Sequence, residues 1–291
     1  MDTIRLCAAT RDLLGEAPVW VARERALRWV DIDGRRSYRY DPATGEVSFV
    51  DYGEEITCVV PRRGGGFLCT FADGFAELDD AARFLRWLAR PSLPPDHKFN
   101  DGGVDPAGRF YCGTMNTVSK EQTGALYRLE RDGSASQVLH GVSTSNSLAW
   151  SPAGDTLYYC DTNERTIRAY DYNPASGRIG AMRTFADAEA DAAPGKPDGS
   201  AVDCQGFVWN ARWRGWSVAR FVRDGSLDRL IALPVKCPTC CAFGGDDLKT
   251  LYVTTATKAL SAEEIEAQPF AGGLLSLDVD VPGLECPEAD Y

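Results

Sequence analysis

The stretch KFNDGGVDPAGRFYCGTM, residues 98–115, contains polar residues, a run of small residues, a turn and an aromatic strand, in that order. Its Gly- and Pro-containing segment favours turns, whereas the aromatic run that starts at Phe110 is typical of a β-strand. Asn100 and Asp101 have two possible explanations. They form a turn with their own backbone, or they present oxygen atoms to a ligand. The choice depends on whether the same arrangement recurs elsewhere in the chain.

Short aromatic or β-branched runs similar to the one at Phe110 recur at intervals of 40 to 50 residues. A period of this length, with several short strands per unit, is the signature of a propeller blade. We therefore predict an all-β fold, a six-bladed β-propeller with about four antiparallel strands per blade and a central channel, forming one domain over residues 1–291. A solenoid, the alternative repeat fold, usually has a shorter period. The runs begin at Leu27, Phe67, Phe110, Leu157, Phe207 and Leu251.

Charge and apolar patterning argue against several functional classes. The chain has 31 basic and 42 acidic residues, a net charge of −11, and no basic cluster, so nucleic acid and anionic membranes are poor candidate partners. No segment approaches the roughly 20 apolar residues of a membrane span, and the N-terminus does not resemble a signal peptide. Ten scattered cysteines are typical of buried free thiols in a reducing compartment. These thiols suggest a cytoplasmic protein. We also expect a monomer, because a closed propeller leaves no long exposed strand edge.

Helical patterning is scarce. Residues 261–268, SAEEIEAQ, form the clearer candidate helix. Residues 79–88, DDAARFLRWL, are the second candidate, although this segment could also be a strand.

An oxygen-bearing side chain stands at a similar position before four of the recurring runs. Asn100 lies ten residues before Phe110, and the offsets in three other repeats are nine or eleven. Equivalent positions in a ring of blades lie at one height around the axis, so these side chains would converge on the channel. The other two repeats have Thr57 and Cys240 near that position. The four residues are Glu16, Asn100, Asn146 and Asp198.

Such a set of side chains is hard and oxygen-rich, and its two carboxylates match the charge of a divalent cation. The competing explanation is that each residue separately favours a turn. Four occurrences at nearly the same offset favour a common site. Oxygen ligands suit calcium, magnesium or manganese, but zinc and iron(II) also accept carboxylates, so the identity of the ion stays open.

Several segments resemble a known family. LGEAPVW, KFNDGGVDPAGRFYCGTM, TSNSLAWSPAG and PDGSAVD are similar to landmark motifs of the senescence marker protein/gluconolactonase (regucalcin-like) family, and CCAFGGDDLKTLYVTTA resembles its last blade. The resemblance runs in order from about residue 13 to residue 276. It implies a six-bladed propeller that hydrolyses sugar lactones with one divalent metal ion in the channel. It also implies that Glu16, Asn146 and Asp198 bind the metal, and that Asn100 lies beside it and contacts substrate or a bound water.

The chain departs from the family pattern at three places. Lys98 stands where the family commonly has Arg, and Lys offers a point charge in place of a planar fork. Ser147 replaces the Gly that usually follows the Asn of the third motif. Asn116 and Thr117 stand where some members carry an acidic substrate-binding residue. The metal ligands are therefore better supported than the substrate contacts.

The predicted reaction opens a sugar-acid lactone to the free acid, with a metal-activated water attacking the lactone carbonyl. Asp198 is the candidate catalytic residue, both ligand and general base, because a carboxylate beside such a water can accept its proton. Lys98, Asn100 and Asp101 are the candidate substrate-binding residues. The expected partner is therefore a small-molecule sugar lactone, which places the protein in carbohydrate metabolism.

The direction in which two arginine side chains point stays open. Arg212 and Arg214, in WNARWRGW, could reach the channel mouth and favour an acidic lactone. We prefer the other expectation, an outward-facing Arg side chain over Trp213 or Trp216.

Other chemistries are less well supported. With only His97 and His140, the chain cannot build a His-rich zinc site, and it has no Gly-x-Ser-x-Gly elbow. A related arylesterase or phosphotriesterase activity remains the alternative reaction. A calcium-binding propeller without turnover is the alternative of a different class.

Overall fold

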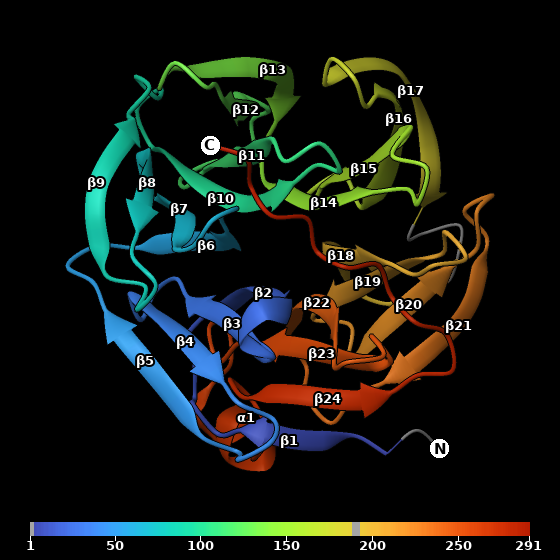
Figure 1. Cartoon of the computed structure of the whole chain (residues 1–291). Coiled ribbons are helices and arrows are strands. Elements are labelled where there is room, and N and C mark those ends of the chain that lie inside the picture. Colours follow the sequence, from blue (N-terminus) through green and yellow to red (C-terminus); the bar gives the residue numbers. More distant parts are fainter. Residues whose placement is uncertain (1–2, 188–192) are drawn as a thin grey trace.

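The computed structural model describes residues 3–187 and 193–291, which form six four-stranded antiparallel sheets. Figure 1 shows these sheets as blades around a central axis. The predicted all-β, six-bladed propeller is confirmed. No helix in the described ranges is long and apolar enough to span a membrane.

The blades follow one another along the chain. Blades one to three consist of β2 (Gly15–Val21), β3 (Ala26–Asp31), β4 (Arg36–Tyr40), β5 (Val47–Asp51); β6 (Ile56–Pro61), β7 (Phe67–Phe71), β8 (Gly74–Leu78), β9 (Phe84–Ala89); and β10 (His97–Val104), β11 (Phe110–Asn116), β12 (Gly124–Leu129), β13 (Ala135–Val142). Blades four to six consist of β14 (Ser145–Trp150), β15 (Thr156–Asp161), β16 (Thr166–Asn173), β17 (Arg178–Asp187); β18 (Lys196–Val202), β19 (Val208–Trp213), β20 (Ser217–Phe221), β21 (Leu227–Ala232); and β22 (Pro238–Gly244), β23 (Thr250–Thr255), β24 (Leu274–Asp278), β1 (Arg5–Ala8). A 3₁₀ turn, η1 (Ala22–Glu24), and one helix, α1 (Ala262–Ala267), complete the described elements.

The recurring aromatic runs are the second strands of the blades. Every residue of β3 and β7 is buried, because adjacent blades cover both faces of these strands. The rim strands are half-exposed by comparison, as in β5 and β9. The period visible in the sequence therefore reflects the depth of each strand in the ring.

The N-terminal strand closes the ring. β1 pairs antiparallel with β24, with Arg5 opposite Ser276 and Leu6 opposite Leu275. The Arg5 guanidinium also forms an ion pair with Asp278 at 2.6 Å. The last blade is thus built from both ends of the chain, a pairing that the repeat pattern does not predict.

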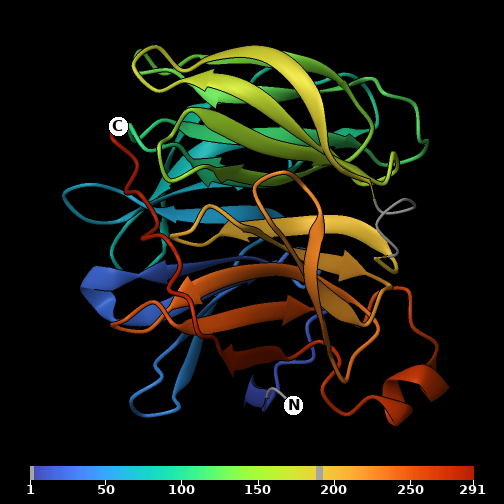
Figure 2. The same ribbon diagram turned by 90° about the vertical axis from the view of Figure 1, so that its right-hand side faces the viewer.

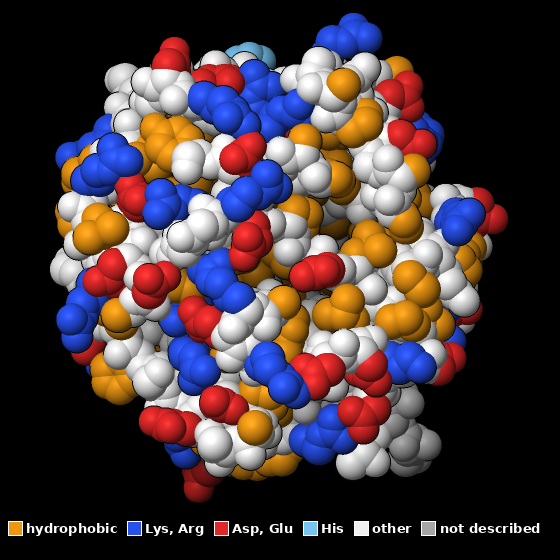
Figure 3. Space-filling model, viewed as in Figure 1, with side chains coloured by type: hydrophobic (Ala, Val, Ile, Leu, Met, Phe, Trp, Pro, Cys, Tyr) orange, Lys and Arg blue, Asp and Glu red, His pale blue; other side chains and the backbone are white. Residues whose placement is uncertain are grey.

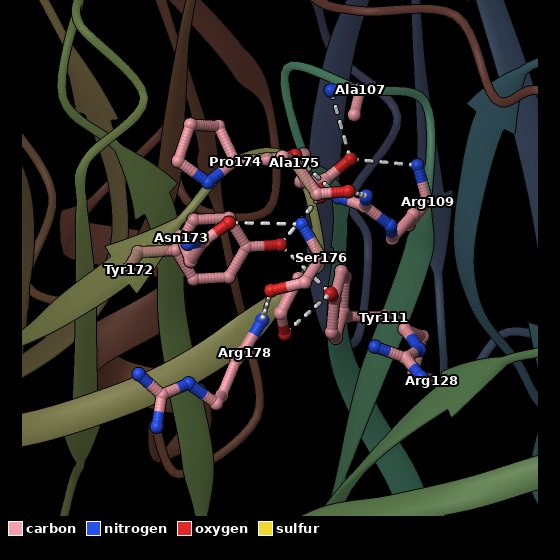
Figure 4. A network of polar contacts seen from close by, with 12 residues as sticks. Ala107, Arg109, Tyr111, Arg128, Tyr172, Asn173, Pro174, Ala175, Ser176 and Arg178 are labelled. Carbon is pink, nitrogen blue, oxygen red and sulfur yellow. Dashed lines mark hydrogen bonds and ion pairs between the residues drawn. The ribbon is translucent and has the colours of Figure 1, made fainter.

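Polar contacts tie neighbouring blades together at their turns. Between blades three and four (Figure 4), Arg109 donates to Asp105 Oδ2 at 2.7 Å and to the Pro174 carbonyl at 2.9 Å. The Tyr172 hydroxyl donates to the same Asp105 carboxylate, and the Tyr111 and Tyr172 hydroxyls lie 2.8 Å apart. The DPAGR turn therefore has a structural role in holding two blades.

The structure resolves the two candidate helices. α1 forms within residues 261–268, and a capping box begins it, in which Ser261 Oγ accepts from Glu264 N and Glu264 accepts from Ser261 N. Residues 79–83 form a turn and residues 84–88 belong to β9, so the second candidate is not a helix and its strand alternative is present. The prediction of free thiols is confirmed for all ten cysteines, and seven of them are buried.

The C-terminal segment, residues 279–291, runs across one mouth of the channel (Figures 1 and 2). Its amides donate to carbonyls near the ends of three innermost strands: Leu284 to Val202, Ala289 to Pro61, and Asp290 to Gly108. In Figure 2 this tail lies on one side of the ring and α1 on the other. The mouth at which the innermost strands begin is thus the opposite one.

Asp12 joins the ends of the chain at the closure of the ring. Its amide donates to the Gly272 carbonyl at 2.7 Å, and its carboxylate accepts from Trp29 Nε1 at 2.8 Å. Burial, opposed by the Trp29 hydrogen bond and reinforced by the charge of Asp31, raises the pKa of Asp12 to about 7.

The Asp12→Asn variant should therefore change the pH dependence of stability. In the native protein, Asp12 stays protonated up to pH about 7, whereas the unfolded chain releases that proton near 3.8, so the free energy of unfolding falls as pH rises between these values. Asparagine keeps the acceptor for Trp29 and cannot ionise. Urea titrations should show a gain over wild type that grows by about 2 to 3 kcal/mol from pH 5 to pH 8. A gain independent of pH would contradict this assignment.

Candidate metal and substrate site

The innermost strand of every blade breaks register with its neighbour at the same height. Regular pairing is interrupted just after Gly15–Glu16 in β2 and after Pro197 in β18, and the other four innermost strands show the same interruption. Such an irregularity bends the strand and re-aims its side chains. The residues brought to this height are Glu16, Thr57, Asn100, Asn146, Asp198 and Thr239.

The observed pairing of β22 with β23 shifts the position predicted for the last blade by a single residue. Thr239, not Cys240, is equivalent to Thr57, because each lies inside the same register break and bonds through Oγ1 to a threonine on the next strand. The Thr57–Thr70 and Thr239–Thr254 distances are 2.7 and 2.8 Å. A count from sequence landmarks misses this because Thr239 lies five residues before the end of β22, whereas Thr57 lies four residues before the end of β6.

Three buried carboxyl groups lie close enough in the channel to repel one another. Burial and the charges of Asp198 and Asp101 raise the pKa of Glu16 well above its usual range. Burial and Asp101 do the same to the pKa of Asp198, while Arg212 opposes the shift. Burial raises the pKa of Asp101 to about 6, although backbone amides of Leu148, Gly102 and Ser147 oppose it. Such a cluster is short of positive charge.

Asp198 Oδ1 is buried and has no hydrogen-bond partner among the described residues. Buried acceptors are normally satisfied, so an orphaned carboxylate oxygen beside Glu16 fits a bound cation. Within the described ranges, no three His, Cys, Asp or Glu side chains form a ready metal cluster. A cation here would therefore also need the amide oxygen of Asn146.

Hydrogen bonds through the nitrogens fix the side-chain amide groups of Asn100 and Asn146. The Thr162 hydroxyl donates to the Pro197 carbonyl at 2.9 Å, so its oxygen must accept from Asn146 Nδ2 at 2.8 Å. Asn100 Nδ2 donates to the Ser145 carbonyl at 2.9 Å and to Asn146 Oδ1 at 3.2 Å. Both nitrogens are thus committed to acceptors. The predicted proximity of Asn100 and Asn146 is present.

The backbone of Asp198 is anchored from two neighbouring strands. Ser147 Oγ donates to the Asp198 carbonyl, and Asn210 Nδ2 donates to the same oxygen at 2.8 Å. Ser147 has φ +63°, in the region that favours glycine, which explains the Gly of the family motif. Here the hydroxyl contact is present despite that backbone strain. Thr162 and Asn210 were missed from the sequence because neither lies in a recurring position.

The candidate substrate residues lie in different environments. Lys98 forms an ion pair with Glu55 of the neighbouring blade at 2.7 Å. Arg212 is buried, and donates to Asn210 Oδ1 at 2.9 Å and to the Pro194 carbonyl at 3.1 Å. The preferred outward-facing arrangement is therefore wrong for Arg212. Arg214 is exposed and donates to the Ala259 carbonyl at 3.3 Å.

Asp101 lies one residue deeper than Asn100 and faces a second part of the channel. Together with Cys58 and Cys240 it lines a cavity of about 350 Å³ that extends to the tail at Cys286. Figure 3 shows this face of the molecule, where hydrophobic side chains gather around a central hollow. Asp101 accepts from Leu148 N at 3.3 Å. Its carboxyl group therefore lies on the tail side of the layer that Glu16, Asn100, Asn146 and Asp198 form, and not at the opposite mouth of the channel.

Residues 14–257 match the SMP-30/Gluconolactonase/LRE-like region family. The chain belongs to this family. Within it, the chain is 36% identical over 289 residues to 6-deoxy-6-sulfogluconolactonase of Pseudomonas putida, covering 98% of each chain. It is 37% identical to a pentonolactonase of Haloferax volcanii, covering 97% of this chain and 96% of the relative. A calcium-binding protein, regucalcin, of Agrobacterium tumefaciens has the same fold, with TM-score 0.94, 28% identity and coverage of 100% and 98%.

Family membership agrees with the geometry at the channel. The matched region starts two residues before Glu16 and contains Asn100, Asn146 and Asp198. The four side chains that the repeat brings to one height therefore all belong to the part of the chain shared with the SMP-30/gluconolactonase family.

Proposed function

We propose that this protein hydrolyses a sugar-acid lactone to the free acid with one divalent cation held by Glu16, Asn146 and Asp198. The observation that carries the proposal is the orphaned, buried Asp198 oxygen beside a second buried carboxyl group and an oriented amide oxygen. Relatives named for lactone hydrolysis, aligned over nearly the whole chain, support the same reaction. The name of the regucalcin structure supports a cation, calcium among the candidates.

A bound divalent ion would supply Lewis acidity, polarising the lactone carbonyl and stabilising the charge that develops on its oxygen. Asp198 would accept a proton from the attacking water. It would return that proton to the ring oxygen as the bond between the carbonyl carbon and the ring oxygen breaks. The amide oxygen of Asn100 is available to accept from a sugar hydroxyl. Ser147 and Asn210 would hold Asp198 in place through its backbone carbonyl.

Lys98 and Asp101 have narrower roles in this proposal. The Glu55 ion pair neutralises Lys98, so we assign it a contact with neutral hydroxyls rather than with an anion. Asp101 would act from below the site by adding negative charge that favours a cation near Glu16 and Asp198.

Removing and restoring metal tests the reaction. The chelator-treated protein should lose hydrolysis of aldonolactones, and a single divalent ion should restore it with one ion bound per chain. Acid release from pentono- and hexonolactones, corrected for spontaneous opening, is the measurement. Stoichiometric binding without hydrolysis of any lactone would overturn the proposal and favour a binding protein without turnover. Full activity after verified metal removal would reject the cation.

A further inference from the structure

The carbonyl oxygen one residue before each proposed metal ligand accepts a hydrogen bond from a side chain of the preceding blade in the ring. All three donor side chains are buried. The contacts run from Asn100 Nδ2 to the Ser145 carbonyl at 2.9 Å, from Thr162 Oγ1 to the Pro197 carbonyl at 2.9 Å, and from Thr239 Oγ1 to the Gly15 carbonyl. Each contact fixes the backbone just before a proposed ligand.

The direction of the Glu16 carboxylate depends strongly on its backbone. Glu16 Oε2 accepts from the amide of its own neighbour, Ala17, at 3.1 Å, and no side chain of a described residue donates to this carboxylate. Asn146 differs, because Thr162 also holds its side chain at Nδ2. The path of residues 15–17 therefore decides where the Glu16 oxygens lie.

The backbone on either side of Glu16 is strained or closely packed. Ala17 has φ +46°, in the left-handed region that disfavours residues other than glycine. An atom at the Cβ position of Gly15 would lie 2.7 Å from the Thr255 carbonyl oxygen, so only glycine lets blade one approach blade six this closely. A strained conformation persists where surrounding contacts hold it, and the Thr239 hydroxyl supplies one such contact.

Thr239 is oriented for this contact from within its own blade. Its hydroxyl proton goes to the Gly15 carbonyl, so Oγ1 accepts from the Thr254 hydroxyl, 2.8 Å away. Thr57 has a matching partner in blade two, Thr70 at 2.7 Å, but the described hydrogen bonds of Thr57 stay within that blade. Of these two equivalent threonines, only Thr239 has a described hydrogen bond to the strand of a proposed ligand.

We propose that Thr239 is a positioning residue for the metal site: through the Gly15 carbonyl, it holds Glu16 in the direction in which its carboxylate binds the cation. This inference rests on the proposed cation site and adds a residue that acts through Glu16. Groups behind the ligands of a metal site set its affinity, because they fix the ligand directions. Loss of the Thr239 hydroxyl should therefore appear in metal affinity.

Calorimetry with Mn²⁺ on the chelator-treated protein tests this inference. We expect Thr239→Val and Thr239→Ala to weaken Mn²⁺ binding by about 10- to 100-fold, whereas Thr239→Ser, which keeps the hydroxyl, should stay within about 3-fold of wild type. Thr70→Val is the matched control and should also stay within about 3-fold. It deletes a buried hydroxyl from the equivalent threonine pair of blade two, whose innermost strand carries no proposed ligand.

Two results would overturn the positioning role. The first is wild-type Mn²⁺ affinity in the variants that delete the Thr239 hydroxyl. The second is an equal loss of affinity in Thr70→Val, since any buried threonine hydroxyl would then have the same effect.

Lactone hydrolysis by the same variants separates this inference from the lactonase proposal. If Thr239→Val binds Mn²⁺ weakly but wild type hydrolyses no lactone, the lactonase proposal fails and the positioning role stands. If wild type is a metal-dependent lactonase and Thr239→Val binds Mn²⁺ as tightly, the positioning role fails and the lactonase proposal stands. If wild type binds none of Mn²⁺, Ca²⁺ and Zn²⁺, both fail.

Discussion

Asp198→Asn is expected to lower kcat/KM for the preferred lactone by roughly a thousandfold or more. Asparagine has almost the same shape, so the backbone contacts from Ser147 and Asn210 should persist. The variant loses the general base and one of the two carboxylates proposed to hold the cation. Initial rates of acid release at saturating metal measure the effect.

Stability measurements on the same variant give an independent readout. Without metal, Asp198→Asn should raise the melting temperature, because it removes a buried charge that Glu16 and Asp101 repel. With metal, wild type should gain more stability than the variant, since the cation binds the native state. Asp171→Asn, an exposed carboxylate on β16, is the control and should change neither. Retention of a tenth of wild-type activity in Asp198→Asn would refute its assigned role.

Asp203→Ala should reduce the free energy of unfolding by about 3 to 5 kcal/mol, a large loss for a single substitution. Asp203 is fully buried and pairs with the buried guanidinium of Arg220 at 2.6 Å. Its carboxylate also accepts from Trp209 Nε1 at 2.9 Å and from Phe207 N at 3.0 Å. Removing it would leave these donors without this acceptor, and Arg220 would keep only the partly exposed carboxylate of Asp228 as its ion-pair partner.

Urea denaturation at neutral pH measures this loss. Arg183→Ala is the matched control, because its ion pair with Asp171 is exposed and should contribute less than about 1 kcal/mol. A loss at Asp203 no larger than that at Arg183 would show that the buried pair does not stabilise the fold.

Asp198 and Asp203 differ in how far their hydrogen-bond partners satisfy them. Both are buried aspartates at the start and just past the end of the same strand, β18. Every described contact of Asp203 is to a donor that satisfies it, whereas Asp198 keeps one oxygen without a partner. The unsatisfied acid faces the channel, where a ligand can reach it.

The repeat of apolar runs was sufficient to predict the fold, because it records which strand of each blade is buried on both faces. It also predicted the channel position of Glu16, Asn100, Asn146 and Asp198, since strands at the same place in every blade begin at the same height. Strand periodicity is a local property of the chain, and local properties are readable from residue order.

The partners of strands and side chains could not be predicted from the repeat in the sequence. Contacts between distant segments and the exact length of each strand decide three features: the pairing of β1 with β24, the shift from Cys240 to Thr239, and the burial of Arg212. The same holds for Lys98 and Lys196, which occupy equivalent places in sequence. Lys98 forms an ion pair with Glu55 of the adjacent blade, whereas Lys196 donates to the amide oxygen of Asn163, because blades two and four present different side chains to them. Repetition along the chain predicts where a side chain stands, and only the packing of neighbouring blades determines the charge that it meets.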